Sequence, residues 1–153
     1  MKNTILNPSA NSLNIRLSDH FTLSEMTFSG VALRYELKNI PTDVELENLR
    51  HLCELVLEPL RRRYGRIIIL SGYRSPVVNA LVGGVPNSQH QRGEAADIFV
   101  GSLEKGRKYV DFNIRNTDFD QLTREPLIPG GIPCPCWLHT SHTGCRRNRH
   151  SVL

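Results

Sequence analysis

One short stretch, residues 88–100, constrains this chain more than any other. It reads Ser-Gln-His-Gln-Arg-Gly-Glu-Ala-Ala-Asp-Ile-Phe-Val and places His90 and Asp97 seven residues apart. His90 lies in a loop rich in Gly, Asn, Pro and Ser, Gly93 allows a tight turn, and Asp97 begins an apolar strand pattern. Imidazole and carboxylate groups are both good zinc ligands. The stretch therefore predicts a loop histidine and a strand aspartate that converge on one metal ion.

A zinc site needs a further protein ligand, and the best candidate is His139. It lies in the segment Cys-Trp-Leu-His-Thr-Ser, residues 136–141. A catalytic zinc has three protein ligands and one water, and two histidines with one carboxylate fit this pattern. His142 would face the other side of a strand. The alternative interpretation is that His90 is a surface histidine and Asp97 an aspartate at a strand end, with no shared metal.

The residues around these ligands resemble a known family. The pattern Ser-x-His-x-x-Gly-x-Ala-x-Asp at 88–97, with Trp-x-His at 137–139, is similar to the zinc-dependent carboxypeptidases and endopeptidases of bacterial cell walls, the D-Ala-D-Ala carboxypeptidase-like (M15) peptidases. The resemblance spans roughly residues 18 to 142. Its other segments are Phe-Thr-Leu-Ser-Glu-Met at 21–26, Ser-Gly-Tyr-Arg-Ser at 71–75 and Phe-Asp-Gln-Leu at 119–122.

This resemblance implies a zinc peptidase that hydrolyses peptidoglycan stem peptides with a metal-activated water, of the D,D- or L,D-carboxypeptidase or endopeptidase type. It implies that His90, Asp97 and His139 hold Zn²⁺ and that Arg74 lies near the substrate. A guanidinium is suited to that place because it binds a peptide carboxylate or the developing oxyanion. The implied partner is the stem peptide, and neither nucleic acid nor a membrane is expected.

The chain departs from the family pattern at the general base. Many relatives have a glutamate three residues before the last histidine, where this chain has Cys136. A thiol replaces a proton-shuttling carboxylate poorly. We therefore predict Glu125 as the base, with Asp120 as the second candidate. Strand alternation places these two acids on opposite faces, so only one of them can point at the metal.

Two alternatives stay open. Cys134, Cys136 and Cys145 cluster in the sequence with His139 and His142 and together could hold a structural zinc. The absence of Glu-x-x-His also favours a catalytically weak module that binds the cell wall, or a virion structural module, that keeps the fold and the metal.

Length and composition favour one soluble globular domain, since the chain has 153 residues, of which 39% are hydrophobic and 22% charged. We expect an irregular arm at residues 1–17, a peptidase domain at 18–142 and a basic tail at 143–153. No apolar run approaches the roughly 20 residues of a membrane span, and no secretory signal is visible at the N-terminus. We expect cytoplasmic synthesis and access to the cell wall through lysis or on a phage particle.

The predicted elements mix helices and strands without regular alternation. An amphipathic helix is expected from Thr42 to Gly65, interrupted at Pro59, and others at 23–29, 76–82 and 103–116. Short strands are expected at 67–70, 97–100, 119–123 and 137–141, and a loop at 126–136. The expected fold is α+β, a small mainly antiparallel sheet flanked by helices in a single domain.

Overall fold

The sheet confirms the predicted fold class. The computed structural model describes residues 15–126, 136–144 and 147–153, with the side chains at 125, 126 and 136 outside that description. Its five strands follow the order β1-β2-β4-β3-β5, and every pair is antiparallel except β3 with β5. The bounds are β1 Ile69–Ser71, β2 Ala95–Val100, β3 Gln121–Pro126, β4 Cys136–Ser141 and β5 Ser151–Val152. The chain is α+β with a mainly antiparallel sheet, as expected.

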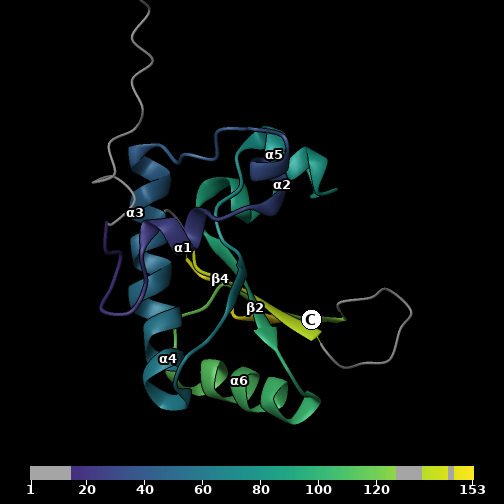
Figure 1. Ribbon diagram of the computed structural model, residues 1–153. Coiled ribbons are helices and arrows are strands. Elements are labelled where there is room, and N and C mark those ends of the chain that lie inside the picture. The colour runs from purple at the N-terminus through teal and green to yellow at the C-terminus, as the bar shows by residue number, and fades with distance from the viewer. Residues whose placement is uncertain (1–14, 127–135, 145–146) are drawn as a thin grey trace, which may run out of the picture.

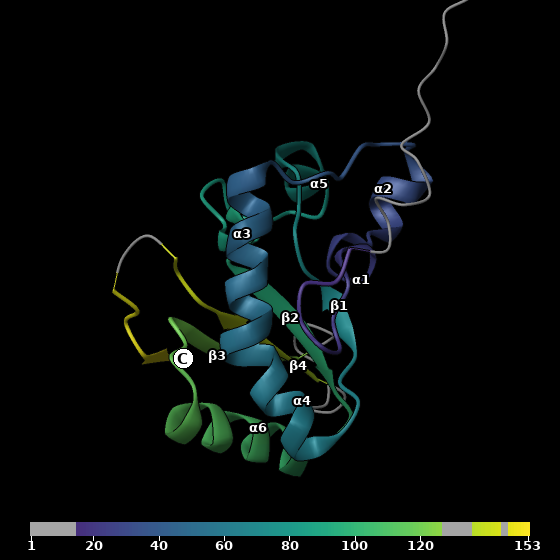
Figure 2. The same ribbon diagram turned by 90° about the vertical axis from the view of Figure 1, so that its left-hand side faces the viewer.

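One long helical column covers one face of this sheet (Figures 1 and 2). It begins as α3 (Asp43–Leu52), where the Glu45 carboxylate accepts a hydrogen bond from the backbone N–H of Thr42 at 2.7 Å. It continues as the π-helical segment η2 (Cys53–Leu57) and ends as α4 (Glu58–Tyr64). The expected interruption at Pro59 thus takes the form of a π segment, because proline lacks the N–H and its ring crowds the carbonyl four residues back.

The core lies between this column and the sheet. The helix α6 (Leu103–Asn116) runs across the lower end of the molecule in Figure 1 and contributes Tyr109, which is fully buried. Alternate residues of the central strands point toward the helices. The fully buried side chains of the helical column and of strands β2, β3 and β4 are Leu49, Leu52, Cys53, Val56, Leu57, Leu60, Ala96, Ile98, Val100, Leu122 and Leu138. This face holds the fold together, and Cys53 is one of its buried core residues.

Three short helices lie at the upper end of the molecule, beside the other face (Figure 1). They are α1 (Leu23–Thr27), α2 (Gly30–Arg34) and α5 (Pro76–Leu81). Each has a hydroxyl at its N-cap that accepts from the backbone: Thr22, Ser29 and Ser75. The sequence left residues 30–40 ambiguous, and α2 is too short to show a helical period.

The segment 143–153, for which the sequence predicts a basic tail and no strand, ends in a short strand. Ser151 and Val152 form β5, which pairs in parallel with Gln121 and Leu122 of β3. Arg149 binds the fully buried carboxylate of Asp120 with its backbone N–H and its guanidinium. Two residues carry no readable strand signal, so only the pairing itself identifies this element. Within the described residues, every helix is too short or too polar to cross a membrane.

Candidate metal centre

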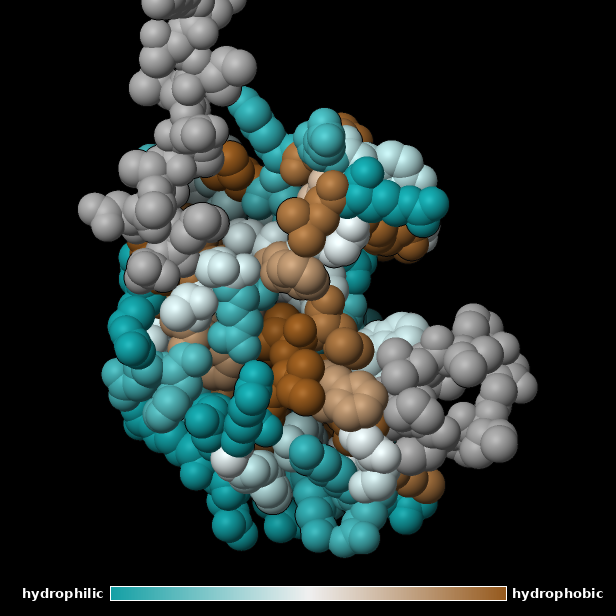
Figure 3. Space-filling model, in the orientation of Figure 1, coloured by the Kyte–Doolittle hydropathy of each residue, from teal (hydrophilic) through white to brown (hydrophobic). Residues whose placement is uncertain are grey.

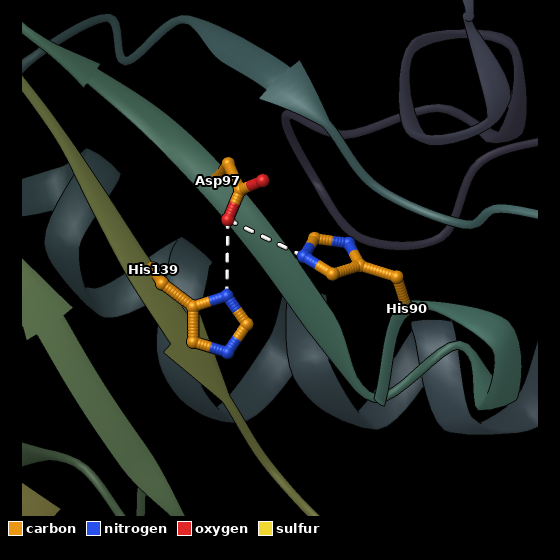
Figure 4. A group of neighbouring side chains, drawn as sticks. All are labelled: His90, Asp97 and His139. Carbon is orange, nitrogen blue, oxygen red and sulfur yellow. Dashed lines mark hydrogen bonds and ion pairs between the residues drawn. The ribbon is translucent and has the colours of Figure 1, made fainter. Parts of the chain in front are cut away.

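The three predicted metal ligands meet on the face of the sheet opposite the helical column (Figure 4). Asp97 of β2 and His139 of β4 are direct cross-strand partners, so both side chains project from the same face. His90 approaches from η3 (Gln89–Arg92), a single 3₁₀ turn before β2. Asp97 Oδ1 lies 3.0 Å from His139 Nδ1 and 3.3 Å from His90 Nε2.

The His90 ring is fixed by a backbone carbonyl. Its Nδ1 lies 2.7 Å from the carbonyl oxygen of Gly72, which can only accept, so Nδ1 carries the proton and donates it. Gly72 itself packs so closely on α1 that a Cβ there would lie 2.3 Å from the Met26 carbonyl oxygen. The hydrogen bond therefore directs Nε2 of the ring toward Asp97. Such an outer partner is typical of a metal-binding histidine.

Gly93 ends the η3 turn in the left-handed conformation, with φ +70°. A Cβ at this position would also lie 2.3 Å from the carbonyl oxygen of Glu45 in α3. The glycine that the sequence assigned to a tight turn is therefore required twice, for its backbone angle and for this close approach. It lets the chain pass from His90 into β2 within a few residues.

The electrostatics of the group favour an ionised carboxylate at Asp97. His90 is 3% exposed and Asp97 is 8% exposed. Burial opposes ionisation of Asp97, but hydrogen bonds from His139 and His90 outweigh it, so the pKa of Asp97 lies well below its usual value. The ionised carboxylate thus faces two imidazole rings, His139 Nδ1 at 3.0 Å and His90 Nε2 at 3.3 Å. Imidazole nitrogens and an ionised carboxylate are donors that a cation between these atoms can use.

The donor set fits zinc. One ligand atom from each of the three residues lies within 4.8 Å of the others, and within the described ranges this is the one group of metal-ligating side chains with such geometry. Zinc takes His nitrogen and carboxylate oxygen at about 2.0 to 2.2 Å in tetrahedral sites, which separates ligand atoms by about 3.3 Å. The separations of 3.0 and 3.3 Å agree with this value.

Comparison with known protein families decides the relationship. The family model for peptidase M15 matches residues 19–125, more than half of the chain. The chain belongs to the peptidase M15 family. The match includes the predicted ligands His90 and Asp97 and ends before His139, which the structure brings close to them. No curated protein matches the chain significantly.

Arg74, predicted to lie near the substrate of this M15 site, also contacts a metal ligand. Its Nη2 donates to Asp97 Oδ2 at 2.7 Å, and its Nε donates to Ser71 Oγ at 2.8 Å. The guanidinium therefore orients the carboxylate and leaves Oδ1 turned toward the two histidines. Sequence reasoning did not find this contact, although Ser71 and Arg74 both belong to the Ser-Gly-Tyr-Arg-Ser motif. The role of Arg74 toward a substrate stays a prediction.

The two candidate bases occupy different places. In the register of β3 with β4, Thr123 is opposite the predicted ligand His139, and Glu125 is opposite Trp137. Positions 123 and 125 are two residues apart, so they belong to the same face of β3. The Glu125 side chain lies outside the described part of the chain, and its role stays a prediction. Asp120 is fully buried, and its carboxylate accepts from Arg149 and from Nε2 of Gln89. It anchors the C-terminal segment and the residue before His90.

The structure describes only the two histidines of the alternative zinc site. Cys134, Cys145 and the side chain of Cys136 lie outside the described residues. His139 faces Asp97. His142 lies apart from it, with its backbone N–H donating to the Glu94 carbonyl at 2.9 Å and its Nε2 3.8 Å from Asp118 Oδ2. In the structure the two histidines of the proposed cysteine cluster thus have different neighbours.

Proposed function

We propose that this M15 chain is a zinc-dependent peptidase that hydrolyses peptidoglycan stem peptides, of the D,D- or L,D-carboxypeptidase or endopeptidase type. The observation that carries the proposal is the convergence of His90 Nε2, Asp97 Oδ1 and His139 Nδ1 on one face of the sheet. Three protein ligands leave one coordination position of a tetrahedral ion for water or substrate, as catalytic zinc requires.

Zinc supplies an activated water and polarises the scissile carbonyl when it is bound in such a site. The residues of the chain then divide the remaining work. Gly72 and Arg74 hold His90 and Asp97 in their binding orientations. Arg74 also presents a fixed positive charge beside the site, where it stabilises a developing oxyanion. We assign to Glu125 the transfer of a proton from the attacking water to the leaving amine.

A second candidate is a wall-binding or virion structural module with little turnover. It is favoured by Cys136, which stands where many relatives have the catalytic glutamate. In this case the metal and the fold persist, whereas hydrolysis is slow. For either candidate, we propose that the protein reaches the cell wall through lysis or as part of a phage particle.

The test combines metal analysis of the purified protein with digestion of peptidoglycan, read by mass spectrometry of the released peptides. We expect one zinc per chain and cleavage within the stem peptide. His90→Ala should lose most of the metal and reduce cleavage to background, and Cys136→Ser is the matched control. If Cys136→Ser loses the zinc while His90→Ala keeps it, the cysteine cluster is the true site. Full zinc without cleavage in the parent protein would favour the second candidate.

A further inference from the structure

A cavity of about 460 Å³ adjoins the metal centre between α2, β1 and α5. Ser71 and Arg74 line it, and Arg74 is the same residue that donates to Asp97 at 2.7 Å. The Arg74 side chain is therefore a shared wall between the cavity and the metal ligands. Through Arg74, the cavity and the metal ligands are direct neighbours.

The rest of the lining is mainly apolar and open to solvent. Phe28, Leu70 and Val82 are 61%, 42% and 43% exposed, and Val78, which also lines the cavity, is buried. Figure 3 shows a band of apolar side chains that runs from α2 and α5 down the centre of this face. Large exposed apolar side chains gathered around a cavity mark a binding surface more often than isolated ones do. This lining suits methyl and methylene groups.

The charge of the cavity has one sign. Arg34 and Arg74 line it, and no carboxylate does among the residues described there. Arg34 is exposed at the end of α2, with its guanidinium 5.6 Å from the centroid of the Tyr35 ring. Across the described ranges it has no hydrogen-bonding or ion-pair partner, unlike Arg74. A cation without a protein partner beside an apolar cavity is suited to a ligand carboxylate.

We propose that this cavity is the substrate subsite that reads a carboxylate next to the scissile bond, with Arg34 as its specificity-determining residue. The occupant is a peptide segment with small apolar side chains and a carboxylate. Arg34 donates a charge-assisted hydrogen bond to this carboxylate. The inference rests on the proposed peptidase function, because it assigns the substrate side of the same site. The carboxylate belongs either to the free end of the stem peptide or to one of its side chains.

The experiment compares three synthetic stem peptides: one unmodified, one amidated at its C-terminus, and one amidated on its side-chain carboxylates. Binding is measured by calorimetry on metal-stripped protein, where no turnover occurs, and kcat/KM is measured on the zinc-loaded protein. We expect amidation of one of the two carboxylate types to weaken binding and lower kcat/KM about 10-fold, the usual order for one charged hydrogen bond. Which peptide is affected identifies the source of the carboxylate.

Arg34→Gln should remove this preference. Its binding and kcat/KM for the peptide whose critical carboxylate is amidated should equal those of the parent protein. Arg63→Gln is the matched control, because Arg63 is likewise exposed and lies 5.4 Å from the neighbouring Tyr64 ring, far from the cavity lining. Equal handling of all three peptides by the parent protein, or a preference that survives in Arg34→Gln, would overturn the subsite. Preferential binding without hydrolysis would instead refute the peptidase and leave the subsite standing.

Discussion

The two faces of the central sheet have different roles, although successive residues of the same strands supply both faces. In β4, Leu138 is fully buried against the helical column, whereas the next residue, His139, projects from the opposite face toward Asp97. In β2, Ile98 and Asp97 repeat this division. Because the side-chain period of a strand is two, adjacent positions can be assigned separately to stability and to chemistry.

The difference shows how a small domain can carry a buried polar site. The helical column and α6 seal one face with apolar side chains, so the sheet does not depend on the other face for its core. That other face then accommodates an ionised carboxylate and two imidazoles, provided that each group has a partner. The partners come from the edge of the sheet: the Gly72 carbonyl for His90 and the Arg74 guanidinium for Asp97.

The largest effect is expected at Glu125, the predicted general base. Glu125→Gln removes the proposed base without removing a proposed metal ligand, so we expect turnover of peptidoglycan to fall by about 10² to 10⁴-fold with zinc content unchanged. Asp120→Asn is the comparison, since it weakens the buried pair with Arg149 and should cost about 1 to 3 kcal/mol of stability with little change in rate. Full activity in Glu125→Gln would remove the assignment of the base to Glu125, whereas a loss of activity in Asp120→Asn at unchanged stability would favour Asp120 as the base.

Adjacent residues of β4 give the sharpest test of the two faces. Leu138→Ala removes a fully buried side chain, and we expect a loss of about 2 to 5 kcal/mol in the free energy of unfolding. His139→Ala should cost metal-free protein only about 1 kcal/mol, the usual value of one hydrogen bond, and abolish zinc binding. Chemical denaturation with and without chelator measures both. A large destabilisation by His139→Ala in chelator would break the division between the faces.

A smaller effect is expected at Arg74, which links the chemical face to the edge of the sheet. Arg74→Gln removes the guanidinium that orients Asp97, and the loss of such an outer partner typically weakens metal binding about 10- to 100-fold. The change also removes the charge beside the substrate, so kcat should fall even at saturating zinc. Zinc titration monitored by a competing chelator separates the two effects. Unchanged zinc affinity together with reduced kcat would leave Arg74 with the substrate role alone.

The sequence predicted the elements of the site better than their pairing. His90 and Asp97 lie in one local motif, and Asp97 begins an apolar run that reads as a strand, so both were accessible to pattern reasoning. The register that sets Asp97 opposite His139 was not, because β2 and β4 are neighbours in the sheet but not in sequence. Long-range register depends on the packing of the whole sheet.

Three other features could not be predicted from sequence patterns. The π segment Cys53–Leu57 has the same apolar stripe as the α-helix around it, so only the structure shows how the chain accommodates Pro59. The pair of Asp120 with Arg149 joins a strand start to a stretch that reads as a basic tail. The contact of Arg74 with Asp97 depends on side-chain geometry that a motif does not contain.

The origin of the ligands from distant parts of the chain has a consequence for zinc during refolding. Asp97 and His139 are 42 residues apart, so an unfolded chain must close a long loop to offer them together. Cys134 and Cys136, by contrast, are two residues apart and offer thiolates locally at almost no loop-closure cost. A metal that also binds the unfolded chain stabilises the native state less than its native affinity implies. Excess zinc is therefore expected to slow refolding, and zinc added after refolding to give the higher yield of native protein.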